Sequence, residues 1–316
     1  MASPHGISGQ WGYVSETNPG QAITVNKFLP FVSENVGRNI ARLESQGKRA
    51  GRMVVHSWKS GGDLISGSVE LELWNTDIAT LLYHCFGGVA TATNGAQWDY
   101  TYTPGDLTGQ SFTMQVGRPD IGGTVRPFTW AGCKVGGWQL TANVDQIAML
   151  SLDVLAMTET NGTALASASY DAALAPFVFT EGSLVVASTT NNAVQSFELS
   201  GDNAVIPRVR LGSATSREPL ANDMRTYDGT IVTDFEDLTA YNRFVNGTES
   251  ALVLNFDNGT EQLVVTTNVR YDGTSPSVSS FSLLTQSLPF KAVSATSDAA
   301  AVTVVLTNAE GLTGAA

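Results

Sequence analysis

The stretch YDGTIVTDFEDLTAYNRFVNGTES, residues 227–250, has the pattern of a strand that runs into a short helix and stops at a glycine. Residues 230–235 are rich in β-forming side chains. Three acidic residues cluster where the helix would begin, where they favour the helix dipole: Asp234, Glu236 and Asp237. One apolar helix face follows, made of Leu238, Tyr241, Phe244 and Val245. Gly247 can end the helix in the left-handed conformation.

An earlier stretch, SGSVELELWNTDIATLLYHCFGG at residues 66–88, repeats this order. Apolar residues at positions 69, 71 and 73 alternate with Glu70 and Glu72, which predicts a half-buried strand. Asn75 or Thr76 can cap the following helix, with Asp77 in its first turn. The expected buried helix face comprises Ile78, Leu81, Leu82, Cys85 and Phe86. Gly87 is the matching helix stop.

The flanking segments also recur in order, which predicts an internal duplication. GRNIARLESQG at residues 37–47 parallels NAVIPRVRLGS at residues 203–213, and a turn-linked pair of strands follows each strand–helix unit. Residue identity between the copies is weak, and any two β-rich halves would share strands and turns. A single helix at the same place in each half favours duplication over that alternative.

These patterns predict a mainly β chain with two tandem domains, each with one flanking helix. The expected boundaries are an extended N-terminal arm (1–36), a first domain (37–158), a linker (159–176), a second domain (177–310) and a flexible C-terminus (311–316). In the arm, Pro30 excludes a central strand. The arm could pack on its own domain or on a neighbouring subunit. Its candidate inter-subunit contacts are Ile23, Val25, Phe28, Leu29 and Phe31.

Charge is unevenly distributed along the chain. The formal net charge is −12, of which residues 1–158 carry −2 and residues 159–316 carry −10, whereas residues 1–60 carry +4. A globally acidic protein is poorly suited to gripping nucleic acid. The basic loop at residues 42–52 could bind phosphate, or could be an exposed tip or an interface cluster, through Arg42, Lys48, Arg49 and Arg52.

Signs of catalysis, metals or cofactors are lacking in the sequence. The chain has three histidines and no recognisable nucleophile, phosphate-loop or metal-binding motif. His84 beside Cys85 lacks a second ligand pair, and the acidic residues 234–237 are better explained as helix-start charges than as a glycosidase pair. Both cysteines are expected to be reduced. No apolar run predicts a membrane span and the start lacks a secretory signal, which favours cytoplasmic synthesis and makes the Asn-Gly-Thr triplets turn signals.

Several motifs together resemble one protein family. They are ISGSVELELW followed by a helix and two glycines, SFTMQVGRPDIGGTVRPFTWAGCKVGGWQL, YDGTIVTDFEDLTAYNRFVNGTESALVLNF, NVRYDG and LPFKAV. In this order they resemble the major tail (tail tube) proteins of long-tailed bacteriophages, of the type common among phages of actinobacteria. The resemblance runs from about residue 6 to residue 308. It implies β-sandwich or half-barrel domains whose rings stack into a tube that carries double-stranded DNA into the host.

The resemblance also implies partners and a location. The chain would contact itself, the tape measure protein and DNA in the lumen, and the tail terminator and baseplate or tail-tip proteins, within a virion tail assembled in the host cytoplasm. Two domains per chain would let three chains form a pseudo-hexameric ring; six chains with the second copy outside is the alternative. The lumen is expected to be acidic, and the basic loop to lie between rings. The competing hypothesis is a carbohydrate-binding adhesion module that uses Trp58, Trp74, Trp98 or Trp130.

Overall fold

The structure is a computed structural model that describes residues 6–273, 283–294 and 296–311. Of the predicted C-terminal segment, only Gly311 lies within the described residues.

The chain is mainly β, with two α-helices and three short 3₁₀ turns among the described residues. The first half contains β1 (Gln10–Ser15), β2 (Lys27–Phe28), β3 (Ser33–Glu34), β4 (Gly37–Glu44), β5 (Trp58–Glu72), α1 (Ala79–Phe86), β6 (Gly87–Asn94), β7 (Gln97–Pro104), β8 (Phe112–Pro119), β9 (Val125–Asn143), β10 (Met149–Ala156) and β11 (Thr158–Thr160). The second half contains β12 (Gly182–Val186), β13 (Thr189–Thr190), β14 (Val194–Asp202), β15 (Val205–Arg210), β16 (Ser213–Ala221), β17 (Thr226–Asp234), α2 (Thr239–Asn246), β18 (Ser250–Asp257), β19 (Gln262–Tyr271), β20 (Thr285–Ala292) and β21 (Val302–Asn308).

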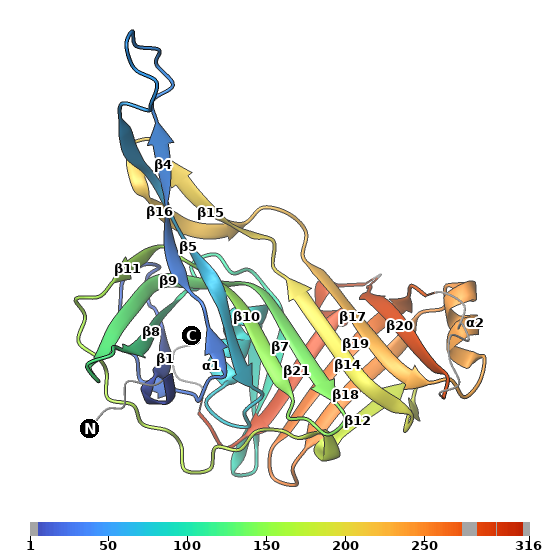
Figure 1. The fold of residues 1–316 in the computed structure, drawn as a ribbon. Coiled ribbons are helices and arrows are strands. Elements are labelled where there is room, and N and C mark those ends of the chain that lie inside the picture. Colours follow the sequence, from blue (N-terminus) through green and yellow to red (C-terminus); the bar gives the residue numbers. More distant parts are fainter. Residues whose placement is uncertain (1–5, 274–282, 295, 312–316) are drawn as a thin grey trace.

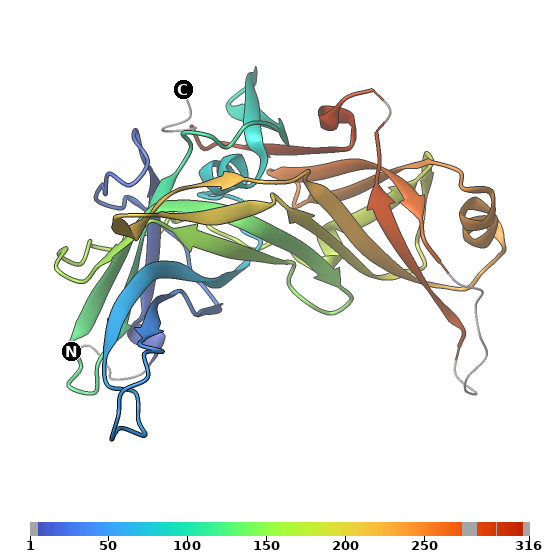
Figure 2. The same cartoon turned by 90° about the horizontal axis from the view of Figure 1, so that it is seen from above.

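Two sheets form a β-sandwich. The front sheet has the antiparallel order β5-β10-β9-β14-β17-β20. The back sheet has the order β6-β7-β21-β19-β18-β12, and β19 also pairs with β20, which joins the two sheets. The front sheet crosses the middle of Figure 1, and Figure 2 shows the elongated molecule from above. Alternating apolar side chains from both sheets fill the space between them, as expected of half-buried antiparallel strands.

A third group of strands, the N-terminal sheet, covers one end of the molecule in the order β2-β1-β8-β9. β9 belongs to both the N-terminal sheet and the front sheet. Its first part pairs with β8, and its second part pairs with β10 and β14. Gly132 lies between these parts with φ of +68°, a left-handed conformation that glycine adopts without strain. The single strand therefore turns from one sheet into the other.

Strands from the two halves of the sequence pair directly. β9 pairs with β14 in the front sheet, and β7 pairs with β21 in the back sheet. The segment predicted as a linker begins with β11, which pairs with β9, and then follows the first half without further named strands. Asn75 fixes its end, because its side chain donates to the carbonyl of Ala173 and accepts from the amide of Ala175. The halves thus share continuous sheets and one contiguous core.

Several local predictions are confirmed. The side chains of Val69 and Leu71 on β5, and of Leu73 just after it, are buried. Gly87 and Gly247 end α1 and α2 with φ of +90° and +61°. Asn258 and Gly259 form the turn of the β18–β19 hairpin. These features depend on short-range sequence, which explains why patterns alone identify them.

The predicted start of α1 is wrong. The helix begins at Ala79 after Ile78, and no side chain caps it. Asn75 holds the 173–175 segment instead, and the hydroxyl of Thr76 is buried without a hydrogen-bond partner among the described residues. Asp77 lies before the helix in the left-handed region, with φ of +56°. The tertiary contacts of Asn75 and Asp77 outweigh their local capping preference.

The two predicted helix faces differ in burial. Ile78, Leu81, Leu82, Cys85 and Phe86 are all buried, which confirms the apolar face of α1. The expectation of a core face does not hold for α2, where Leu238 and Val245 are 56% and 58% exposed. Tyr241 and Phe244 are half-buried. The difference arises because α2 lies at the outer end of the sandwich, where it contacts mainly β19 (Figure 2).

The N-terminal segment is not a free arm in this chain. β1 pairs with β8 along its whole length, and Trp11 and Tyr13 are fully buried. Val25, Phe28 and Leu29 are buried against the same chain, and a role for them as inter-subunit contacts stays a prediction. Phe31 is half-buried and only Ile23 remains exposed. Pro30 does exclude a central strand here, but large apolar side chains on either side of it complete the core.

Candidate functional site

The outward face of the front sheet carries polar side chains in aligned rows. One row joins Glu70, Ser151, Gln139, Ser200, Asp228 and Lys291 across six strands. A second row joins Ser68, Asp153, Gly137, Asp202 and Thr226. Because side chains alternate along each strand, the neighbouring rows, such as Val69, Leu152 and Trp138, point into the core.

Acidic residues dominate this outward surface, which we call the acidic face. Its carboxylates are Glu70, Glu72, Asp153, Glu198, Asp202, Asp228 and Asp234. Lys291 is a basic residue on the same face, and its Nζ lies 3.8 Å from Oδ1 of Asp228. Both side chains are about half exposed, so water screens this pair strongly. The face as a whole is electronegative.

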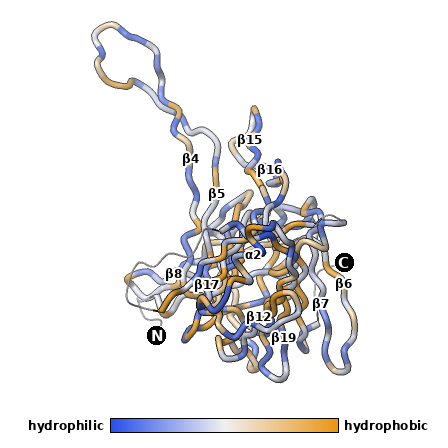
Figure 3. The backbone as a smooth tube through the Cα atoms, turned by 90° about the vertical axis from the view of Figure 1, so that its right-hand side faces the viewer, coloured by the Kyte–Doolittle hydropathy of each residue, from blue (hydrophilic) through white to orange (hydrophobic). Residues whose placement is uncertain are grey.

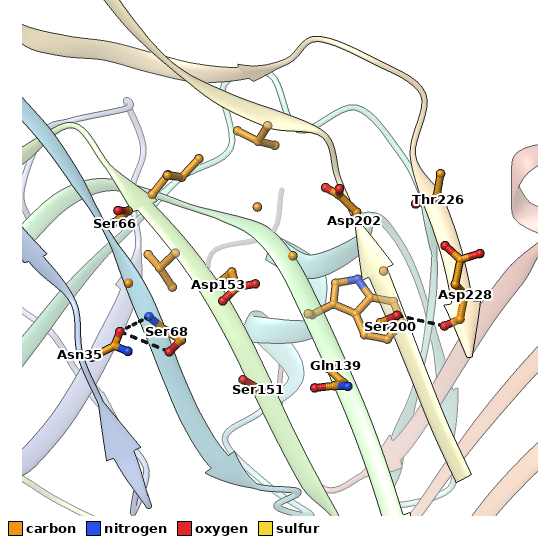
Figure 4. A pocket seen from close by; sticks show the side chains of 18 residues that line it. Asn35, Ser66, Ser68, Gln139, Ser151, Asp153, Ser200, Asp202, Thr226 and Asp228 are labelled. Atoms are coloured by element: carbon orange, nitrogen blue, oxygen red, sulfur yellow. Dashed lines mark hydrogen bonds between the residues drawn. The ribbon is translucent and has the colours of Figure 1, made fainter. Parts of the chain in front are cut away.

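A depression of about 950 Å³ occupies the upper part of the acidic face. Figure 4 shows Asp153 on β10, Asp202 on β14 and Asp228 on β17, and serines and glycines also line the depression. Partial burial, together with the nearby charge of Asp202, raises the pKa of the Asp153 carboxyl. Burial is the larger cause of this raised pKa, and repulsion between the two carboxylates adds to it. Such a surface disfavours the approach of phosphate groups.

Uncharged side chains orient several of these carboxylates. Gln139 donates to Glu198 at 2.7 Å, and Gln195 donates to Asp234 at 2.6 Å. The hydroxyl of Ser33 donates to Glu70 at 3.1 Å. Amide and hydroxyl donors fix a carboxylate in place but leave its formal charge uncompensated. The hydrogen bonds therefore order the acidic face and preserve its negative potential.

Two hairpins, which we call the projecting pair, extend from the top of the sandwich in Figure 1: residues 38–63 of β4–β5 and residues 205–221 of β15–β16. The base of the β4–β5 hairpin touches the β15–β16 hairpin near its turn, where a Cβ built on Gly62 would lie 3.0 Å from Val209. Large apolar side chains are exposed along both hairpins, including Leu43, Met53, Val54 and Leu211. Figure 3 shows these hydrophobic segments alternating with hydrophilic ones.

The projecting pair has a charge opposite to that of the rest of the chain. It contains nine Lys or Arg residues and three Asp or Glu residues, a net charge of +6, so the rest of the chain carries −18. A buried ion pair anchors β16 to the sandwich, with Nζ of Lys134 2.6 Å from both Oε1 of Glu218 and the carbonyl oxygen of Leu107. The chain is thus strongly polarised along the direction in which the hairpins point.

The basic loop residues lie on the projecting pair as exposed side chains. Lys48, Arg49 and Arg52 occupy the tip of the β4–β5 hairpin. Arg42 lies lower on β4 and stacks over the exposed ring of Trp58, with its guanidinium carbon 4.8 Å from the ring centroid. Contacts of this kind are worth about 0.5–1 kcal/mol at exposed sites. They stiffen the hairpin but leave the charges of its tip free.

The other sequence candidates are dispersed. Trp74 and Trp130 are buried, whereas Trp58 and Trp98 are exposed on different hairpins, so the four do not form one platform. Both cysteines are free and buried, as expected. Within residues 6–273, 283–294 and 296–311, no cluster of His, Cys, Asp and Glu is arranged to hold a metal ion. Asp237, two residues before the start of α2, accepts a hydrogen bond from the amide of Thr239 at 2.7 Å.

A model of the phage tail tube protein family matches residues 6–292, which is most of the chain. The chain belongs to the phage tail tube protein family. None of the curated proteins compared with this tail tube protein matches it. In the part that the structure describes, neither α-helix is long and apolar enough to cross a membrane. Membership of this family assigns the protein a structural role in the virion tail.

The sequence shows the net negative charge of the chain but not which residues form this surface. Strand alternation separates two faces without indicating which one is outward. The missed signal is that acidic residues recur on the face opposite the apolar residues in several separate strands, as in Glu70 and Glu72 of β5 or Glu198 and Asp202 of β14. The anchor between Lys134 and Glu218 joins residues 84 positions apart, and no local pattern predicts it.

Proposed function

We propose that this tail tube protein assembles with copies of itself into stacked rings that form a hollow conduit for the ejection of double-stranded DNA into the host. The observation that carries the proposal is the acidic face, which runs through strands of both halves. DNA binds cationic surfaces tightly, so a conduit must avoid them. A wall of fixed carboxylates, serines and glycines repels the polymer and keeps it mobile.

The acidic face lines the bore in this proposal. Its carboxylates lie on the outer side of a sheet whose inner side is packed core, so the face requires no further apolar cover. Its rows continue from β5 to β20 without a break at the junction of the halves. A continuous sheet of this kind supplies a smooth wall, with backbone groups satisfied by neighbouring strands.

The projecting pair makes the contact between rings. Its net charge of +6 complements the net charge of −18 on the rest of the chain. Its exposed apolar side chains become buried when they pack against a neighbouring ring. The basic loop was predicted for this role, and the β15–β16 hairpin extends the same surface. Stacking then places basic hairpins of one ring against acidic residues of the next.

Three chains form each ring in this proposal. The two halves lie side by side in the same sheets, and one projecting hairpin precedes each of α1 and α2. Three such chains supply six comparable positions around an axis. Six chains per ring, with the second half outside, is the alternative arrangement.

The remaining partners follow from the tail tube role. The tape measure protein would occupy the bore before DNA does, and the terminator and the baseplate or tail-tip proteins would bind the two ends. Assembly would take place in the host cytoplasm and would end in the virion tail. The protein needs neither catalysis nor a cofactor for this work.

Electron microscopy and mass measurement of the purified protein test the proposal. We expect regular hollow tubes, and rings whose mass corresponds to three chains of 33.4 kDa. A ring of six chains would reject the trimer and leave the tube in place. A protein that stays monomeric at high concentration and low salt would reject the assembly itself.

A further inference from the structure

A largely buried cluster of one lysine and two carboxyl groups joins three distant parts of the chain. Nζ of Lys27 in β2 lies 2.5 Å from Oδ1 of Asp77, just before α1, and 2.8 Å from Oε1 of Glu310, just after β21. The three side chains are 21%, 10% and 8% exposed, respectively. Neither the acidic face nor the projecting pair includes this cluster.

Hydrogen bonds to the backbone of Asp77 and Glu310 hold these two residues in place. The hydroxyl of Tyr13 donates to the carbonyl oxygen of Asp77 at 2.6 Å, and the hydroxyl of Tyr100 donates to the carbonyl oxygen of Glu310. Asn308 accepts the Glu310 amide and donates to the carbonyl of Asn75, which links the two segments again. Buried tyrosine rings thus lie around the site where the amine of Lys27 contacts the two carboxyl groups.

Glu310 is incompletely satisfied within this cluster. Its second oxygen, Oε2, is buried and has no hydrogen-bond partner among the described residues. Burial is the main cause that raises the pKa of this carboxyl, although Lys27 opposes the shift. A simple salt bridge would have no need of a second, half-satisfied carboxylate. A group that receives and returns a proton does need a free oxygen.

We propose that Lys27 and Asp77 form an intramolecular isopeptide bond, with Glu310 as the proton shuttle. The Lys27 ammonium gives a proton to Glu310, and its freed lone pair attacks Cγ of Asp77. A carbon–nitrogen bond forms, and the bond between Cγ and one carboxyl oxygen breaks. That oxygen leaves as water with two protons from the ammonium group, one of them passed through Glu310, which ends unchanged. An ammonium and a carboxylate thus become one amide and one water, with no oxidant or co-reactant.

The geometry brings the reacting groups of this condensation together. A contact of 2.5 Å to Oδ1 brings Nζ near the distance of about 3–3.5 Å from which attack on the adjoining carbon proceeds. The two carboxyl groups are largely buried, which limits the access of the water that would reverse the reaction. The two carboxylates outweigh burial and raise the pKa of Lys27, so the resting amine is charged and needs the neighbouring acceptor before it reacts.

Intact mass spectrometry of the denatured, purified full-length protein tests the bond. We expect a mass lower than that of the sequence by one water, after allowance for loss of the initiator methionine. Tryptic digestion should yield one branched product that joins the fragments containing Lys27 and Asp77. A wild-type protein with the full sequence mass and two separate fragments would overturn the proposal.

Two variants separate this bond from other losses of water. Lys27→Arg keeps the positive charge but removes the primary amine, and Glu310→Gln removes the proton shuttle; both should show the full sequence mass. Cyclisation at Asp228-Gly229 or Asp272-Gly273 would also release water, but it would persist in Lys27→Arg and would thereby contradict the proposal. If a variant does not fold, the branched fragment in the wild type decides the question alone.

Discussion

At the scale of single residues, burial determines which polar groups matter for stability. His84 is fully buried on α1, with Nε2 2.8 Å from Oγ of Ser15. Burial, with a smaller contribution from Lys134, lowers the pKa of His84 to about 3. The folded protein therefore holds this imidazole neutral at pH values where the unfolded chain protonates it.

Lowering the pH from 7 to 5 should weaken the fold through His84. Because the folded pKa lies below the unfolded value, stability is fully present above about pH 6.5 and is lost as the pH falls towards 3. The loss should be about 1.4 kcal/mol per pH unit below 6.5, or about 2 kcal/mol at pH 5. Denaturant unfolding at both pH values measures it. The slope should shrink in His84→Asn and persist in His56→Asn, whose parent side chain is exposed; equal slopes in all three proteins would contradict the assignment.

Gly229, on the core side of β17, leaves room for the aromatic side chain of Phe290. A Cβ at this position would clash with the carbonyl oxygen of Glu198 and the ring of Phe290. Gly229→Ala should therefore lower the free energy of unfolding by about 1–3 kcal/mol. Gly136→Ala is the matched control, because its Cβ would meet its nearest neighbours at 3.7 Å. A similar denaturation midpoint for both variants would show that the core relaxes around the added methyl group.

At the scale of elements, the β4–β5 hairpin combines a paired stem with an exposed tip that is available for contacts with other subunits. Ser45 and Ser57 close its tip through a backbone hydrogen bond of 3.0 Å, so residues 46–56 lie beyond the paired strands. The side chains of this tip are exposed and contribute nothing to the core. Stability and assembly should therefore separate at this point in the chain.

Replacing residues 46–56 by a short Gly-Ser turn should preserve the melting temperature within a few degrees and abolish long tubes. Electron microscopy should then show isolated rings or short stacks. Lys48→Gln with Arg49→Gln is a milder variant that keeps the hairpin, and it should shorten tubes most at low salt, where electrostatic contacts are strongest. Long tubes from the truncated protein would exclude the hairpin from the contact between rings.

Local elements were predictable from sequence, and their pairing was not. The glycine stops of α1 and α2 and the Asn258-Gly259 hairpin depend on a few adjacent residues. The pairing of β9 with β14 joins residues some 60 positions apart, and the cluster of Lys27, Asp77 and Glu310 spans nearly the whole chain. Asp77 shows the limit most clearly, because its local pattern indicates a helix charge but a distant lysine determines its place.

At the scale of the whole molecule, charge is sorted by location. The projecting pair is basic and the front sheet is acidic, although the sequence intermixes them: β5 contributes Lys59 to one and Glu70 to the other. A polarised subunit of this kind attracts copies of itself in a head-to-tail direction and repels a polyanion from its sheet. Composition alone showed the net charge but not this division.

Asp202→Lys with Asp228→Lys should convert the proposed bore wall into a DNA-binding surface. We expect tubes of this variant to retain double-stranded DNA in a salt-sensitive manner, measured by co-sedimentation at rising ionic strength. Asp257→Lys with Asp272→Lys is a control of equal charge, placed at the ends of back-sheet strands. Equal DNA retention by the two variants would remove the acidic face from the bore.

The direct pairing of β9 with β14 and of β7 with β21 also has a mechanical consequence. Backbone hydrogen bonds, rather than a flexible hinge, fix the angle between the two halves. In a ring assembled as proposed, that angle sets the curvature of the wall and hence the calibre of the tube. A tail built this way bends only between rings, while each ring keeps a constant diameter along the path of the genome.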